Sequence, residues 1–369
     1  MSISTGMFKV AAVTTLVTAL GAAGCSTPED GEGETTSPFS LTVRVENATV
    51  EEVAGALATY IDEVDDTDHG LPANWQVAGA GNLEEGEAAL GAALKLPGGD
   101  RVIEVCNHHY AEQAMSFGGH HGVALPCEIG VNQVGDDVEV VLLEPEAIFG
   151  IFFNDIPAEY AAGMSGLAAT VKGELEQLIV AGLAELDTSY VGEAVGPSWS
   201  KDEMADFAGM DHAIAMDLEI PTSYLADQES RQTFKSLFVD SLLETLTHED
   251  MEKVGSEVEG LSVAAWRAAR PYALGLPGQV DVVEMCSPTY AEAAMSTGAH
   301  HAPALPCQTA IWVEGDTLRV HLLDPLFIFP VFFSDAPAEM MEAMGGMASA
   351  VRQDIQMIVG AAQSTALQH

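Results

Sequence analysis

Two pairs of adjacent histidines, each followed a few residues later by a cysteine, are the strongest candidates for chemistry in this chain. The first set is Cys106, His120, His121 and Cys127, and the second set has the same spacing: Cys286, His300, His301 and Cys307. Thiolates and imidazoles are suitable ligands for Zn or Cu. The sequence therefore predicts that each His-His pair, on a Gly-rich loop, helps to hold a metal or a small or haem-like ligand.

A disulfide in each set is the alternative use of the same four cysteines. Cys106 would pair with Cys127, and Cys286 with Cys307, if the protein lies in an oxidising compartment. Each bridge would close a loop of about twenty residues and stabilise the fold by about 3 kcal/mol. The spacing leaves both the disulfide and the metal or ligand site open.

A thiol-dependent enzyme of sulfur or redox chemistry is a third hypothesis, with Cys106 as nucleophile and His120 or His121 as base. Three carboxylates that recur in the second set could orient such a site: Glu104, Asp155 and Glu159. The same carboxylates could equally be a strand residue, a helix N-cap and a helix-dipole partner. The chain shows no nucleophile elbow, phosphate loop or His-Glu-x-x-His motif, so we assign no catalytic residue and favour binding over catalysis. It also lacks the Cys-x-x-Cys-His motif of covalent c-type haem.

The histidine pairs belong to a long internal repeat. Residues 93–171 align with 273–351 without a gap, and about half of the positions are identical. A period of 180 residues is far longer than the roughly 20–50 residues of solenoid repeats. The sequence therefore predicts a domain duplication, with a first repeat at 39–185, a linker at 186–208 and a second repeat at 209–369.

The elements that must position these side chains follow from periodicity and turn signals. In the first repeat we expect strands at 41–45, 75–77, 101–106, 125–134 and 138–143, the last two joined by a hairpin turn at 135–137. We expect helices after a capping box at Thr49–Glu52, at 109–117 and from Pro157, the last capped by Asp155. The apolar stripe of that last helix recurs in the second repeat as a methionine-rich stripe, which we interpret as core filler. This order predicts an α+β fold: two homologous domains, each a mainly antiparallel sheet with helices on one face, packed as a pseudo-twofold pair.

Both repeats resemble the DUF302 family, a domain of unknown function. The resemblance rests on Val105-Cys106-Asn107 at a strand end and on Leu125-Pro126-Cys127 at the start of the next strand. The family pattern has Asn-Pro after the first Cys; the first repeat has Asn107-His108 and the second Ser287-Pro288. The resemblance covers most of each repeat and implies an α+β fold and a tendency to pair, but it implies no reaction.

The N-terminus predicts export. Residues 1–24 read as a signal peptide, because Lys9 precedes an apolar run of about fifteen residues, which is shorter than a membrane span of about twenty. Cys25 follows a segment that resembles a bacterial lipobox, although Ala22 stands where Leu is usual. We expect Cys25 to be lipidated, with residues 25–38 as an acidic flexible tether; an ordinary signal peptide is the alternative. The expected location is a membrane-anchored lipoprotein that faces the periplasm or the cell exterior.

The charge is strongly negative. The chain has 13 Lys and Arg against 56 Asp and Glu, a formal net charge of −43. Such a surface argues against nucleic acid as a partner and against a polybasic attachment to lipid. It is typical of salt-adapted (halophilic) extracytoplasmic proteins, in which salt screens the self-repulsion.

Together these patterns predict a lipid-anchored extracytoplasmic binding protein of two tandem domains. Its expected partners are the membrane, through the N-terminal lipid, and a small ligand, while the two repeats pair within the chain. The alternatives are a disulfide-stabilised structural or interaction lipoprotein and, less favoured, the thiol-dependent enzyme.

Overall fold

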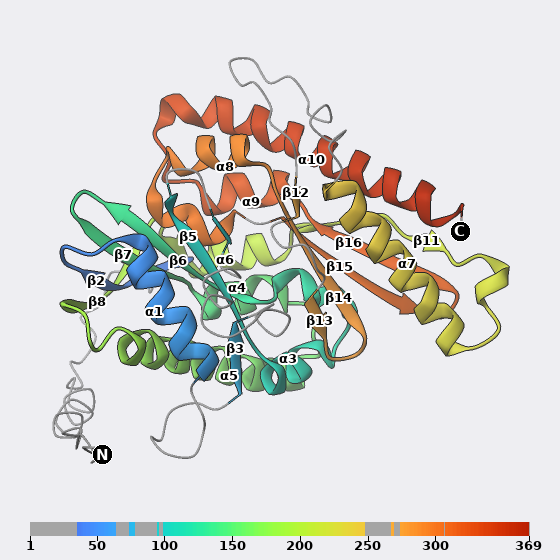
Figure 1. The fold of residues 1–369 in the computed structure, drawn as a ribbon, viewed down its shortest axis with the longest axis horizontal. Helices are drawn as coiled ribbons and strands as arrows, with labels where there is room; N and C mark the ends of the chain where they lie inside the picture. Colours follow the sequence, from blue (N-terminus) through green and yellow to red (C-terminus); the bar gives the residue numbers. More distant parts are fainter. Residues whose placement is uncertain are drawn as a thin grey trace, which may run out of the picture. The chain divides into compact units, whose positions relative to one another are not determined.

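The computed structural model describes residues 35–63, 74–77, 94–95, 99–247, 267–268, 274–305 and 307–368 (Figure 1). The chain divides into two units, Met1–Glu34 and Thr35–His369, and the structure described below is that of the second unit. The predicted signal peptide, Cys25 and most of the tether lie outside the described residues. The side chains of Cys286 and Cys307 also lie outside them, although their backbones belong to strands.

The first half of the unit is built on one antiparallel sheet. Its strands are β2 (Phe39–Val45), β3 (Trp75–Val77), β4 (Leu94–Lys95), β5 (Arg101–Asn107), β6 (Cys127–Val134), β7 (Asp137–Leu143) and β8 (Thr188–Val195). They run in the order β3-β5-β6-β7-β2-β8, with β4 paired to β5. The turn between β6 and β7 contains Gly135 at φ 67°, a backbone conformation that glycine adopts without strain, so the predicted hairpin is confirmed.

The helices of the first half include α1 (Val50–Glu63), α3 (His108–Met115), α4 (Pro145–Phe152) and α5 (Ala158–Gly182). Of these, α1 and α5 pack on the sheet. The predicted capping box begins α1: Thr49 N donates to Glu52 Oε2, and Glu52 N donates to Thr49 Oγ1. Leu57 of α1 and Leu175 of α5 are fully buried, and both helices contact the sheet.

The second half repeats this order of elements. Its strands are β10 (Ala213–Ala215), β11 (Leu218–Glu219), β12 (Arg267–Ala268), β13 (Leu274–Leu276), β14 (Val280–Cys286), β15 (Cys307–Glu314) and β16 (Thr317–Leu323). They form the order β10-β16-β15-β14-β12, with β11 on β16 and β13 on β14. The helices are α7 (Gln228–Thr247), α8 (Pro288–Met295), α9 (Pro325–Phe332) and α10 (Ala338–Ala366), with a short 3-10 helix, η5 (Thr222–Tyr224), before α7. The predicted α+β class is thus confirmed in both halves.

Each histidine pair lies on a 3-10 helix rather than on an open loop. These helices are η4 (Gly119–Ala124) and η7 (Ala299–Ala304). His121 N donates to Gly118 O, and His301 N donates to Gly298 O, as the tighter i to i+3 winding requires. A regular turn therefore fixes the position of both imidazoles.

Residues 186–208, expected to be a linker, are structured. They form β8, the short strand β9 (Trp199–Ser200) and α6 (Lys201–Ala208), and β9 pairs with β1 (Thr35–Thr36). Ser200 and Glu203 make a reciprocal capping box that begins α6. β8 completes the edge of the first sheet beside β2, so this segment belongs to the fold of the first half.

The expectation that Asp155 caps the last helix of the first half is wrong. Pro157 occupies the N-cap position of α5 and makes no side-chain cap bond, while Asp155 contacts the histidines of η4. The interpretation of the methionine stripe is confirmed, because Met344 and Met347 of α10 are buried in the core.

The two halves contact each other through the sheet faces that α1 and α5 leave uncovered. The 3-10 helix of each half packs on the sheet of the other: η4 on β15 and η7 on β6. Gln308 Nε2 donates to Glu128 Oε1 across this boundary at 2.6 Å. The Phe152 and Phe327 rings also meet across this boundary, with their centroids 5.9 Å apart.

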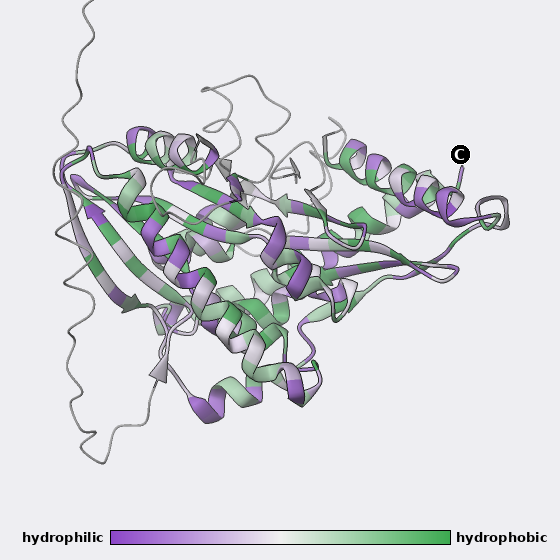
Figure 2. Ribbon diagram, turned by 90° about the horizontal axis from the view of Figure 1, so that it is seen from below, coloured by the Kyte–Doolittle hydropathy of each residue, from purple (hydrophilic) through white to green (hydrophobic). Residues whose placement is uncertain are grey.

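The colouring by hydropathy agrees with this arrangement. Hydrophobic residues follow the strands of both halves, and hydrophilic residues alternate with them along the helices (Figure 2). Among the described residues, no helix is both long and apolar enough to span a membrane.

Candidate metal centre

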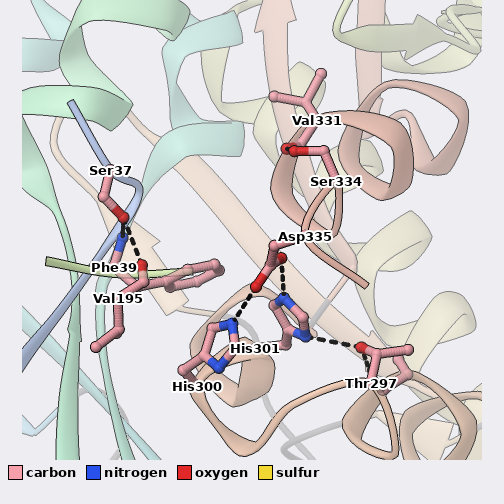
Figure 3. A network of polar contacts seen from close by, with 10 residues as sticks. Ser37, Phe39, Val195, Thr297, His300, His301, Val331, Ser334 and Asp335 are labelled. Atoms are coloured by element: carbon pink, nitrogen blue, oxygen red, sulfur yellow. Dashed lines mark hydrogen bonds and ion pairs between the residues drawn. The ribbon is translucent and has the colours of Figure 1, made fainter. Parts of the chain in front are cut away.

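In the second half, two imidazoles converge on one carboxylate. His300 Nε2 lies 2.9 Å from Asp335 Oδ2, and His301 Nε2 lies 2.9 Å from Asp335 Oδ1 (Figure 3). The histidines come from η7, and Asp335 comes from the turn between α9 and α10. We call these three residues the second cluster.

The first half contains a matching group, the first cluster, made of His120, His121 and Asp155. The corresponding distances to the two carboxylate oxygens are 2.8 Å and 2.9 Å. The His121 and His301 side chains are almost fully buried, at 1% and 0% exposure. The carboxylate of the first cluster is more open than that of the second, with 52% of the Asp155 side chain exposed against 27% for Asp335.

Glycine lets the outer, more exposed histidine of each pair, His120 or His300, fold back over the backbone. A Cβ at Gly298 would lie 2.5 Å from His300 Cε1, and one at Gly118 would lie 2.5 Å from His120 Cε1. Any other residue would push the imidazole away from the carboxylate. The Gly-x-His-His pattern of both repeats is thus a local requirement of the site.

Aromatic side chains enclose the inner, buried histidine of each pair, His121 or His301. Phe153 stacks on His121 with ring centroids 4.4 Å apart, and Phe333 lies 4.3 Å from His301. In the second cluster Phe39, from β2 of the first half, also contacts both imidazoles edge-on, at 5.6 Å and 5.7 Å (Figure 3). These rings exclude water from the buried side of each cluster.

The two hydrogen bonds of Thr297 indicate which ring nitrogen of a neutral His301 carries the proton. Thr297 Oγ1 has one hydrogen and donates it to Ala294 O at 2.6 Å, so its oxygen can only accept from His301 Nδ1, 2.8 Å away. A neutral His301 therefore carries its proton on Nδ1 and turns the Nε2 lone pair toward Asp335. In metal sites a ligating histidine characteristically donates its other N–H to a neighbouring acceptor in this way.

The pKa shifts of His301 and Asp335 describe the charges in the second cluster. Burial lowers the pKa of His301, although Asp335 opposes the shift, so the neutral imidazole is favoured at pH 7. Burial raises the pKa of Asp335, but the contacts with His300 and then His301 hold it well below the usual range, as an imidazole N–H donated to the carboxylate would do. A cation that took the place of such a proton, between Nε2 and the carboxylate oxygen 2.9 Å away, would be stabilised by the same negative charge.

The ligand set suits a transition-metal ion. In each cluster the two imidazole nitrogens and one carboxylate oxygen lie within 4.8 Å of one another. Zn²⁺ binds such atoms at about 2.0–2.2 Å, and two histidines with one carboxylate form a recurrent site for divalent metals with open positions. The residues present therefore fit a metal of this class.

The described cysteines do not join the clusters. Cys106 lies at the end of β5 and Cys127 at the start of β6, and both are free thiols. Among the described residues, the groups of three or more side chains that could together hold a metal ion are the two clusters. Neither of them includes Cys106 or Cys127. The disulfide alternative and any role of Cys286 and Cys307 stay predictions.

The electrostatics of the two thiols bear on the enzyme hypothesis. Burial raises the pKa of Cys106 to about 12 and also raises that of Cys127. A nucleophilic cysteine needs the opposite shift, toward the thiolate. Of the carboxylates suggested as orienting groups, Glu104 is buried within β5, Glu159 is exposed in the first turn of α5, and Asp155 alone contacts a histidine.

The sequence patterns indicated Asp155 only as an orienting group or a helix cap, and they gave no indication of Thr297. The signal for the carboxylate was present, because Asp155 and Asp335 each follow the outer histidine by 35 residues. Thr297 gave no such signal, since Phe117 occupies its place in the first half.

The fold and the site define an α+β protein with two matched His-His-Asp clusters. Residues 87–181 match the family described as "Domain of unknown function DUF302", which supports the resemblance for this part of the first half. The matched stretch contains the whole first cluster, and the family's description assigns it no activity. No curated protein and no solved structure matches the chain.

Proposed function

We propose that this chain is an extracytoplasmic metal-binding protein that holds one divalent transition-metal ion at each His-His-Asp cluster. The observation that carries the proposal is the convergence of His300 Nε2 and His301 Nε2 on the two carboxylate oxygens of Asp335, each at 2.9 Å. The same convergence of two imidazoles on one carboxylate recurs in the first half.

The donor atoms favour Zn²⁺ or Cu²⁺ over Ca²⁺ or Mg²⁺. The alkaline-earth ions prefer shells of oxygen atoms, whereas each cluster offers two nitrogens for one carboxylate. The second cluster provides three protein ligands and leaves further coordination positions to water or to a small ligand. That composition suits a reversible binding or transport role as well as a structural one.

The architecture included in the proposal is a duplicated domain arranged as a pseudo-twofold pair. Its support is the reciprocal packing of η4 on β15 and of η7 on β6. A small cavity between the halves is lined by six pairs of positions 180 residues apart: Val123 and Pro303, Ala124 and Ala304, Glu128 and Gln308, Leu143 and Leu323, Ile148 and Ile328, Phe152 and Phe332. A pseudo-twofold axis through the boundary between the halves would place equivalent residues of both halves around one cavity in this way.

The proposal also includes export and a lipid on Cys25, on the sequence pattern of residues 1–25. In that location the acidic surface would attract cations toward the clusters, an effect that high salt would weaken.

Titration of the full-length chain with Zn²⁺ tests the function. We expect two bound ions per chain and one in the double variant His300→Ala/His301→Ala. The matched control is His108→Ala/His109→Ala, an exposed histidine pair outside both clusters, which should leave the number of bound ions at two. Failure of the native chain to bind, or equal loss in the control, would refute the proposal.

A further inference from the structure

The two clusters have the same three ligands but differ in how openly these ligands face solvent. In the first cluster, 33% of the His120 side chain and 52% of the Asp155 side chain are exposed. In the second cluster the corresponding values are 23% for His300 and 27% for Asp335. Because the ligand atoms and their distances agree, the difference comes from the residues that surround each cluster.

A phenyl ring of the first half closes the second cluster. The ring of Phe39, on β2, lies edge-on to His300 and His301, with ring centroids 5.6 Å and 5.7 Å apart (Figure 3). Gly196, which follows β8, lies beside it: a Cβ there would be 2.9 Å from His300 Cδ2 and 3.0 Å from Phe39 Cδ2. Two residues of the first half thus pack against the outer imidazole of the second cluster.

The first sheet holds Phe39 in place. Its side chain is fully buried, and its backbone pairs with Leu143 of β7 on one side and with Val195 of β8 on the other. Phe39 N donates to Ser37 Oγ at 3.2 Å, and Ser37 Oγ donates to Val195 O (Figure 3). A backbone paired on both sides opens less readily than a loop, so the ring is a fixed wall of the second cluster.

The position equivalent to Phe39 in the second half carries no ring. Phe39 on β2 pairs with Leu143 on β7. Leu323, which lies 180 residues after Leu143, pairs with Ala213 on β10. Ala213 is therefore the counterpart of Phe39, and its side chain is a single methyl group.

The contacts of the first cluster agree with this difference. Among the described residues, the ring contacts of His120 and His121 are with each other and with Phe153, so all of them lie within the first half. From the second half, Trp312 packs against the backbone at the start of η4, where a Cβ on Gly119 would lie 2.5 Å from the indole ring. The second half thus supports the helix that carries the histidines, while the outer imidazole and its carboxylate stay accessible to solvent.

We propose that the second cluster retains its metal ion behind Phe39, whereas the first cluster exchanges its ion with ligands in solution. This inference rests on the proposed function and gives different roles to two sites with the same donor atoms. The apolar shell around a metal site controls the access of solvent to it. A competing ligand can reach an ion in the first cluster directly, but an ion in the second cluster must leave before it can be captured.

Release of Zn²⁺ from the full-length chain into excess chelator tests the inference. We expect a fast phase from the first cluster and a slow phase from the second. The variant His300→Ala/His301→Ala should keep only the fast phase, and His120→Ala/His121→Ala only the slow one. Equal rates at the two clusters, or the reverse assignment, would overturn the inference and leave the proposed function intact. A native chain that binds no metal would overturn both.

Removal of the ring tests the role of Phe39 itself. Phe39→Leu should accelerate the slow phase at least about tenfold and leave the fast phase unchanged. Phe234→Leu is the matched control, because Phe234 is an equally buried phenylalanine, on α7, whose ring packs against Tyr224. Phe39→Met serves as a second variant if the leucine variant does not fold. An unchanged slow phase in a folded Phe39 variant would overturn the inference.

The dependence on chelator concentration gives a readout that a general loss of stability would not change. The fast phase should become faster as chelator is added, because the chelator attacks an accessible ion. The slow phase should keep one rate in the native chain and acquire the concentration dependence of the fast phase in Phe39→Leu. A native slow phase that depends on chelator as steeply as the fast phase would overturn the inference.

Discussion

Replacement of Thr297 by Val should weaken metal binding at the second cluster alone. Thr297 accepts the proton of His301 Nδ1 at 2.8 Å and thereby leaves Nε2 free to bind a cation. Valine has nearly the same shape but cannot accept this proton. His301 would then lose the group that fixes both its tautomer and its ring orientation.

The expected magnitude follows from the position of Thr297. Removal of a hydrogen-bond partner of a metal-bound histidine typically lowers metal affinity about 10–100-fold. That range corresponds to about 1.4–2.7 kcal/mol. We expect the upper part of the range, because the His301 side chain is fully buried and no water could replace the hydroxyl. The first cluster already has the arrangement that Thr297→Val would produce in the second, since buried His121 Nδ1 has no hydrogen-bond partner among the described residues.

The assay is Zn²⁺ binding in competition with a chelator of known affinity, with the midpoint of thermal unfolding measured in parallel. Ser296→Ala is the matched control: Ser296 Oγ also donates to a backbone carbonyl, that of Ala293 at 2.6 Å, but contacts no imidazole. One weakened site in Thr297→Val and none in Ser296→Ala is the expected result. Unchanged binding in Thr297→Val would refute the assignment of the His301 tautomer and the metal-binding argument built on it.

Three further predictions concern the same residues. Burial lowers the pKa of His121 and His301 in the folded chain, so below about pH 6.5 the unfolded chain binds more protons and the free energy of unfolding falls. Urea unfolding of the metal-free chain should therefore show a lower midpoint at pH 5.5 than at pH 7.5, and equal midpoints would contradict this sign. Gly298→Ala should displace His300 and reduce Zn²⁺ binding to one ion by titration, whereas Gly278→Ala, with open space around it but positive φ, should cost stability only. Iodoacetamide should leave Cys106 unmodified in the native chain at pH 8, because burial raises the pKa of its thiol to about 12; rapid labelling without denaturant would revive the thiol-enzyme hypothesis.

Local patterns predicted much of the fold. The Thr49 capping box, the β6–β7 hairpin and the buried stripe of α10 all follow from residues close together in the sequence, and the structure confirms them. Segment 186–208 was harder to interpret, because β8 is stabilised by its pairing with β2, more than 140 residues away in sequence. A strand held by such distant pairing leaves little periodicity of its own.

The candidate site was predicted in part. The histidine pairs stood out because both repeats keep them beside glycine, and that local requirement is visible in the packing of Gly298 against His300. The carboxylate was assigned to helix capping because Asp155 stands just before Pro157, where a cap is common. Only the tertiary fold shows that the side chain turns toward η4 instead. The described cysteines share the sequence neighbourhood of the histidines without joining their clusters.

The most direct test of the metal-binding account is native mass spectrometry of the full-length chain loaded with Zn²⁺, alongside Asp155→Asn, Asp335→Asn and the double variant. The account predicts two ions in the native chain, one in each single variant and none in the double variant. A native chain without metal, or a double variant that still holds two ions, would contradict it.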